Sequence, residues 1–174
     1  MSVTPDVGVH VSDEETIFSI TEGHLDSGLR GIPVGTCKTS YVDTIDGVHY
    51  VGYPVGDLAN LEEEDIIFLM MHKRLPDSDE SAEFRKELAY RGERMPTGAL
   101  RVLENLTPGS GHPMDWLSIG IMALGAAETT GDGRVDSMNL IARMPELMAR
   151  IFLLRGGNPY NLRPRNTELG LVEN

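Results

Sequence analysis

The chain has 174 residues, of which 40% are hydrophobic and 24% charged, so it can form one compact domain with a packed core. Its formal net charge of -12, from 15 Lys and Arg against 27 Asp and Glu, argues against a nucleic-acid-binding protein, because such proteins carry a basic surface. The single cysteine, Cys37, excludes an intrachain disulfide and a cysteine-based zinc site, and the best apolar run, Ile66–Met71, is too short to cross a bilayer.

The N-terminal region is polar and lacks the basic start and apolar stretch of a secretory signal. We therefore expect a soluble, cytoplasmic protein that binds neither nucleic acid nor membrane. Residues 1–27 are interpreted as an N-terminal arm with at most a short strand near Thr16–Ile20. Later acidic runs, such as Glu62–Asp65, are interpreted as a solvated face. An anion site would need the arginines of the C-terminal quarter or another chain.

A β-hairpin is predicted next, with strands at Lys38–Thr44 and Val48–Tyr53. Polar and apolar residues alternate in both segments, and the Asp-Gly pair in Ile45-Asp46-Gly47 between them is a strong hairpin-turn signal. Because a hairpin is not stable by itself, we expect it to pack on helices or on a partner.

From Val55 the apolar spacing becomes helical. A single turn at Val55–Leu61 precedes a helix that Asp65 caps and that ends at Lys73-Arg74. A second helix begins at Asp77 or Ser78 and is stopped by Gly92. Its inward side chains are expected to be Phe84, Leu88 and Tyr90.

Three more helices follow. Pro96 opens one with Leu100, Leu103 and Leu106 inward, and Pro113 is the first residue of the next, whose predicted face is Met114, Leu117, Ile121 and Leu124. Thr129–Arg134 is a polar break. The last helix is amphipathic, kinked at Pro145 and ended by Gly156-Gly157. Its apolar stripe is formed by Leu140, Met144, Leu147, Met148, Ile151 and Leu154. With no alternation of strands and helices, the predicted fold class is all-α with one small hairpin.

A search for reactive groups finds no self-contained active site. None of the five histidines is spaced three or four residues from another, and no nucleophile elbow, phosphate loop or calcium loop is present. His49 is interpreted as a structural hairpin residue, His72 as a partner of the helix dipole, and His112 as a satisfied loop residue before Pro113. We predict no catalytic, cofactor-binding or metal-binding residue in this chain.

Several motifs, in order, resemble the N-terminal portion of the citrate synthase family. The family reads G-L-x-G, a hairpin ending in Y-R-G-Y-x-I-x-D-L-A, a helix ending in L-P, then H-P-M-x-x-L, I-A-x-x-P and a final E-N. The corresponding residues here are Gly28-Leu29-Arg30-Gly31 with Thr36, Tyr41-Val42-Asp43, Val51–Ala59, Ile67–Met71 with Leu75-Pro76, His112–Leu117, Ile141–Pro145, and Pro164-Arg165-Asn166 with Leu169 and Glu173-Asn174. One departure is Val51, where the family usually has arginine.

The resemblance implies an almost entirely helical large domain over residues 28–174, with residues 1–27 as an arm outside it. Family chains are about twice as long, and their two catalytic histidines, catalytic aspartate, substrate-gripping arginines and coenzyme A site lie in the part that would follow. The resemblance therefore implies a scaffold that binds no cofactor itself, although acetyl-CoA would be a substrate of the assembled enzyme.

The leading hypothesis is the N-terminal subunit of a split citrate synthase, which condenses acetyl-CoA with oxaloacetate to citrate and CoA. A C-terminal subunit would carry the catalytic His/His/Asp, and two such pairs would form a heterotetramer. The alternatives are a non-catalytic regulatory or interaction protein derived from the same fold, an excised fragment of a longer protein, and a subunit of a 2-methylcitrate synthase. The isolated chain is expected to be inactive and to self-associate through apolar faces around Met114–Leu124 and Leu140–Leu154.

Overall fold

The structure is a computed structural model, which describes residues 18–28, 30–33, 35–164, 166 and 169–173. The chain forms two compact units, Met1–Cys37 and Lys38–Asn174. In the first, a 3-10 turn, η1 (Glu22–His24), begins after Thr21, whose backbone N–H donates to His24 Nδ1 at 2.9 Å. Of the strand expected near Thr16–Ile20, residues 16 and 17 lie outside the described residues, and residues 18–20 form no strand. The boundary predicted at 27/28 follows the family resemblance and stays a prediction.

The second unit begins with a three-stranded antiparallel sheet in the order β1 (Ser40–Asp43), β2 (Gly47–Tyr50) and β3 (Tyr53–Pro54). The predicted turn is confirmed: Asp43 Oδ1 accepts hydrogen bonds from two backbone N–H groups of the turn. The predicted second strand is too long, because Val51 and Gly52 adopt φ values of 52° and 88° and reverse the chain. This reversal creates β3, which the sequence did not predict.

Two helices follow the short α1 (Val55–Leu58), and each corrects one expectation. The next helix, α2 (Glu63–His72), begins two residues before Asp65, with Glu62 as its N-cap, since acidic residues suit the positive end of a helix. In α3 (Ser78–Gly92) the cap is Asp77, as predicted, and its Oδ1 accepts from two backbone N–H groups. Tyr90 is exposed instead of inward, because two residues of helix turn it about 200° from buried Leu88.

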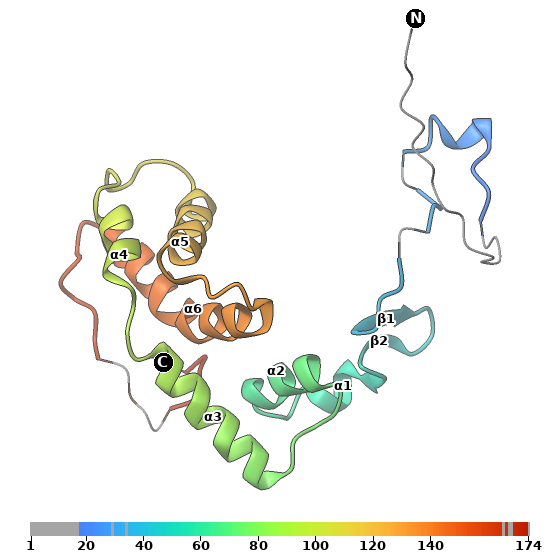
Figure 1. Cartoon of the computed structure of the whole chain (residues 1–174), viewed down its shortest axis with the longest axis horizontal. Coiled ribbons are helices and arrows are strands. Elements are labelled where there is room, and N and C mark those ends of the chain that lie inside the picture. The colour runs from blue at the N-terminus through green and yellow to red at the C-terminus, as the bar shows by residue number, and fades with distance from the viewer. Residues whose placement is uncertain (1–17, 29, 34, 165, 167–168, 174) are drawn as a thin grey trace, which may run out of the picture. The chain divides into compact units, whose positions relative to one another are not determined.

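Three helices complete the unit: α4 (Thr97–Glu104), α5 (Pro113–Glu128) and α6 (Gly133–Arg155). Figure 1 shows α4 and α5 beside α6, in agreement with the contacts that join all three. Pro113 is the first residue of α5, as predicted. The buried face of α5 is Trp116, Gly120 and Leu124 at four-residue spacing, so Met114 lies on the opposite side and is exposed. Pro145 lies inside α6, and the kink stays a prediction.

The buried side chains form two clusters that share α6. One joins α4, α5 and α6 and consists of Met95, Ala99, Leu103, Trp116, Leu124, Leu147 and Ile151. The other joins α2, α3 and α6 and consists of Phe68, Phe84, Leu88, Met138 and Ala142. Where α5 crosses α6 the backbones come close, since a Cβ on Gly120 would lie 2.7 Å from Leu147 Cδ1. Among the described residues, no helix is long and apolar enough to cross a membrane.

Candidate functional site

The three histidines singled out in the sequence lie on separate elements and have structural roles. His49 is buried on β2 and stacks on Tyr41, with ring centroids 4.4 Å apart. His112 caps α5: its Nδ1 accepts from Met114 N–H at 3.2 Å, while Asp115 Oδ2 accepts from its backbone N–H. His72 is the last residue of α2. These contacts agree with the interpretations of His49 and His112 as structural residues, whereas the helix-dipole role of His72 requires a positive charge.

His72 lies between an aromatic ring and a guanidinium group. Its ring stacks on Phe68, with centroids 4.0 Å apart, and both ring nitrogens lie 3.2 Å from Arg134 Nη2. Burial, followed by the positive charges of Arg134 and Arg74, lowers the pKa of His72 below 6.5. The imidazole is therefore neutral at neutral pH and can accept a hydrogen bond from Arg134.

Two of the C-terminal arginines that an anion site would require are paired with carboxylates: Arg143 lies 2.5 Å from Glu128, and Arg150 lies 2.6 Å from Glu146. On α3, Arg91 lies 2.6 Å from Glu87. Burial raises the pKa of Glu128, against the opposing effect of Arg143. The Arg143 pair connects α6 to α5, and the other two pairs each lie along one helix, so they serve the scaffold first.

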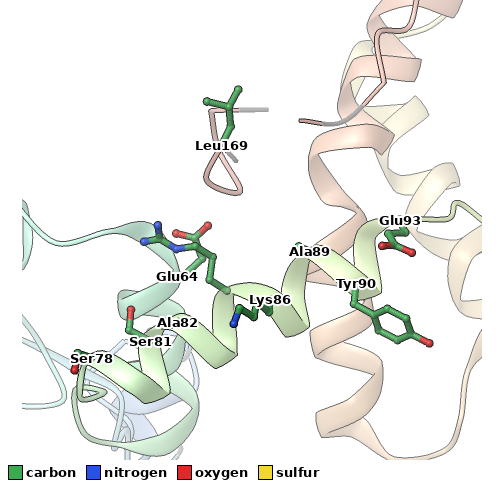
Figure 2. Close-up of a pocket in the computed structure, with 10 residues that line it drawn as sticks. Glu64, Ser78, Ser81, Ala82, Lys86, Ala89, Tyr90, Glu93 and Leu169 are labelled. Carbon is green, nitrogen blue, oxygen red and sulfur yellow. The ribbon is translucent and has the colours of Figure 1, made fainter. Parts of the chain in front are cut away.

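A groove with both polar and apolar lining runs along α3 and is the candidate site that we consider further (Figure 2). Its volume is about 510 Å³, and Figure 2 shows its α3 side chains following one another from Ser78 to Glu93, with Leu169 on a separate loop. The residues that line it are Glu64, Ser78, Ser81, Ala82, Arg85, Lys86, Ala89, Tyr90, Glu93 and Leu169. Hydroxyl, cationic and anionic groups are therefore presented together along one helix.

Glu64 is the exceptional residue of this groove. Its side chain is only 1% exposed, although the neighbouring Glu62 and Glu63 face solvent. Its Oε1 accepts from the backbone N–H of Leu171 at 2.6 Å, a contact between residues 107 positions apart. Within the described residues, its Oε2 has no hydrogen-bond partner. The interpretation of Glu62–Asp65 as a solvated face is therefore wrong at Glu64, and the sequence carries no signal for that burial.

Glu62, Glu63 and Glu64 also place one carboxylate oxygen each within 4.8 Å of the others, as a cation site would. Two features oppose a cation there. The three residues lie at the N-terminal end of α2, where the helix dipole is positive. Arg85 Nη2 already lies 3.6 Å from Glu62 Oε2. The prediction that this chain holds no metal, cofactor or catalytic residue stays a prediction.

Known proteins resemble the chain over most of its length. The family model described as "Citrate synthase, C-terminal domain" matches residues 28–174. Citrate synthase 2 of Bacillus subtilis is 31% identical over 155 residues, which are 84% of this chain and 40% of that protein. A 2-methylcitrate synthase of Mycobacterium tuberculosis is 34% identical over 78% of this chain and 35% of its own length.

A solved structure agrees with these matches. Citrate synthase from Thermotoga maritima superposes with a TM-score of 0.71 at 28% identity, over 86% of this chain and 39% of that chain. The mostly helical fold predicted from the sequence is thus that of citrate synthases. The chain spans well under half the length of the relatives it matches. From the family match over 28–174 and this shared fold, the chain belongs to the citrate synthase family.

Proposed function

We propose that this chain is the N-terminal subunit of a two-polypeptide citrate synthase. It contributes scaffold helices, and a C-terminal subunit supplies the catalytic His/His/Asp that condense acetyl-CoA with oxaloacetate. The observation that carries this proposal is the family match over residues 28–174, set against coverage of only 40% of a relative such as citrate synthase 2 of Bacillus subtilis. The remaining part of the fold must come from other residues, and general acid–base chemistry requires those groups to be held precisely.

Exposed apolar side chains on α5 and α6 support assembly with a complement. The segments expected to carry an apolar face expose Met114, Met122, Met148 and Phe152, the last 79% exposed. A groove of about 450 Å³ between α2 and α6 is also apolar, apart from Glu63 at its rim. Surfaces of this kind mark association sites. A dimer of two such pairs, the heterotetramer, is part of the same proposal.

Two other functions have support of different kinds. A subunit of a 2-methylcitrate synthase is supported by the 34% identity to that enzyme of Mycobacterium tuberculosis. A regulatory protein that keeps the fold without turnover is supported by the structural roles of His49, His72 and His112. Substrate preference distinguishes the 2-methylcitrate synthase from the proposed citrate synthase, since the former would use propionyl-CoA in preference to acetyl-CoA. A complex that binds the partner without turnover would identify the second.

The direct test is reconstitution. The chain is co-expressed with a polypeptide from the same genome that carries the catalytic His/His/Asp motifs, and thiol release from acetyl-CoA is measured with and without oxaloacetate. We expect activity from the complex and none from either chain alone. Equal turnover by the purified chain and by the complex would contradict the proposal.

A charged substitution on α6 tests whether the exposed face is the docking surface. Phe152→Asp should abolish the complex and reduce self-association of the isolated chain in sedimentation experiments, because it places a carboxylate on an apolar interface. Ile45→Asp, at the exposed hairpin turn, is the matched control and should change neither.

A further inference from the structure

Glu64 has a buried carboxylate oxygen, Oε2, that accepts no hydrogen bond from the described residues, and burying such an oxygen costs free energy. Its side chain is 1% exposed, and within the described part of the chain only its Oε1 is hydrogen-bonded, to Leu171 N–H at 2.6 Å. A buried carboxylate oxygen without a donor destabilises a fold, so its presence indicates that a donor arrives from outside these residues.

A second buried polar atom of the same groove lacks a hydrogen-bond acceptor, where Glu64 lacks a donor. Arg85 Nε is a donor without an acceptor among the described residues. Glu64 on α2 and Arg85 on α3 both line the groove, so an occupant that satisfies both must offer a donor and an acceptor. A peptide group offers both, as N–H and C=O. A carboxylate offers acceptors alone, and an ammonium group offers donors alone.

The length of the groove also favours a polypeptide. Its lining residues repeat every three or four positions over nearly all of α3, a helix of 15 residues. At about 1.5 Å per residue, such a helix is roughly 22 Å long, which matches a segment of several residues better than one metabolite.

We propose that the groove along α3 receives a segment of the complementary polypeptide, and that Glu64 positions it. Oε1 of Glu64 holds the segment 169–173 against α2, and Oε2 accepts an N–H from the incoming segment. This inference rests on the proposed function and adds a second docking surface to the apolar face of α5 and α6. The match to only 39% of the Thermotoga maritima chain leaves most of that fold to pack on faces such as this one.

The segment 169–173 is itself arranged around carboxylates. Gly170 N–H donates to Glu173 Oε2 at 3.0 Å, and Leu171 is 5% exposed. A Cβ on Gly170 would lie 3.5 Å from Glu64 Oε1, so the backbone approaches the carboxylate closely. Loss of the Glu64 carboxylate should therefore release this segment as well as the occupant of the groove.

The first measurement is amide hydrogen exchange at Leu171 in the isolated chain. Glu64→Ala removes the acceptor, and we expect Leu171 to exchange roughly ten-fold faster or more. Glu64→Gln keeps a carbonyl oxygen for this N–H and should leave the exchange rate nearly unchanged. Glu63→Gln, on the exposed neighbour, is the matched control. Unchanged exchange in Glu64→Ala would overturn the role assigned to Oε1.

The second measurement is the affinity of the full chain for the polypeptide co-expressed with it. In Glu64→Gln an NH₂ group replaces Oε2, so a donor would face the N–H donor of the incoming segment. We therefore expect binding roughly ten-fold weaker or more, while the thermal stability of the chain stays unchanged. Glu83→Gln, at an exposed position of α3 that lines neither groove, should bind as wild type. Equal affinity of Glu64→Gln and wild type would overturn the role assigned to Oε2, because a merely structural Glu64 would show this result.

The two measurements separate this inference from the proposed function. If the wild-type chain forms no complex, the proposed function fails together with the occupant named for the groove. The exchange rate of Leu171 still decides whether Glu64 holds the segment 169–173. If wild type and all variants form the complex equally well, the proposed function stands and the docking site is elsewhere.

Discussion

Two regions of the molecule differ in how their buried polar groups are hydrogen-bonded. One is the cluster of α4, α5 and α6, and the other is the groove of α2 and α3. In the first, the buried polar group is satisfied internally: Trp116 Nε1–H donates to Ser110 C=O at 2.8 Å, and Arg155 Nη1 donates to the same oxygen at 2.7 Å. In the second, Glu64 and Arg85 keep buried atoms without partners among the described residues. The first region satisfies these buried polar groups from within the described residues, whereas the second leaves the two atoms that we propose a partner satisfies.

The largest predicted effect tests whether the α4–α6 cluster is the stable core. Leu147 is fully buried at its centre, so Leu147→Ala should lower the free energy of unfolding by about 2–5 kcal/mol through lost burial and a cavity. Met148→Ala, at the exposed neighbouring position, should cost little. Urea unfolding followed by circular dichroism measures both. Similar losses for the two variants would show that this cluster is not the core.

The close crossing of α5 and α6 gives the second prediction. Gly120→Val places methyl groups where even a Cβ would lie 2.7 Å from Leu147 Cδ1, so the fully buried Leu147 side chain would have to shift. Overpacking should cost about 1–3 kcal/mol. Gly125→Val is the matched control on the same helix, because nothing lies within 4 Å of a Cβ there. An equal loss at both positions would point to helix propensity instead of packing.

The regular part of the fold followed from the sequence because local signals determine it. Asp77 and Pro113 mark the starts of α3 and α5 whatever surrounds them. The errors arose where the surrounding structure, and not the local sequence, determines the conformation or the exposure of a residue. Tyr90 was predicted inward although it lies about 200° around the helix from Leu88, and it is exposed because another face of α3 meets α6. The strand β3 depends on the left-handed Val51, a conformation that β-branched residues rarely adopt.

The groove could not be predicted, because its central contact is long-range. Glu64 stands in an acidic run, and such runs are normally solvated. Only the fold brings Leu171 to it across 107 positions. The resemblance to citrate synthases led us to propose a partner but pointed to no residue that it contacts. The buried atoms without partners among the described residues, on which our choice of Glu64 rests, are visible only in three dimensions.

A third prediction compares two leucines of nearly equal burial. Leu171 is 5% exposed but belongs to neither apolar cluster. Leu171→Ala should therefore cost less than Leu147→Ala, below about 2 kcal/mol, because the segment 169–173 can open without unfolding the rest. Urea unfolding gives the two losses on one scale. Equal losses would mean that this segment belongs to the same cooperative unit as the α4–α6 cluster.

The smallest predicted effect concerns a carboxylate that contrasts with Glu64. Asp136, near the start of α6, accepts from Thr130 Oγ1 at 2.7 Å, Thr130 N–H at 2.8 Å and Thr129 Oγ1 at 2.7 Å. These bonds, that from the Thr130 hydroxyl first, lower the pKa of Asp136 from 3.8 to about 2. Because the folded state favours the ionised form, its contribution to stability is complete above pH 4 or so and is lost as the pH falls through about 2.

Asp136→Asn should therefore be less stable than wild type at pH 7, and the difference should shrink between about pH 4 and 2. Urea midpoints at pH 7, 4 and 2 or so would measure it. A control is Asp115→Asn in the first turn of α5. The Asp115 carboxylate accepts one backbone N–H, whereas the Asp136 carboxylate accepts from three donors. A constant difference for Asp136→Asn across this range would show that the three bonds orient the turn without favouring the charge. The satisfied carboxylate would then contribute geometry alone, and the contrast with Glu64 would rest on burial and not on the number of donors.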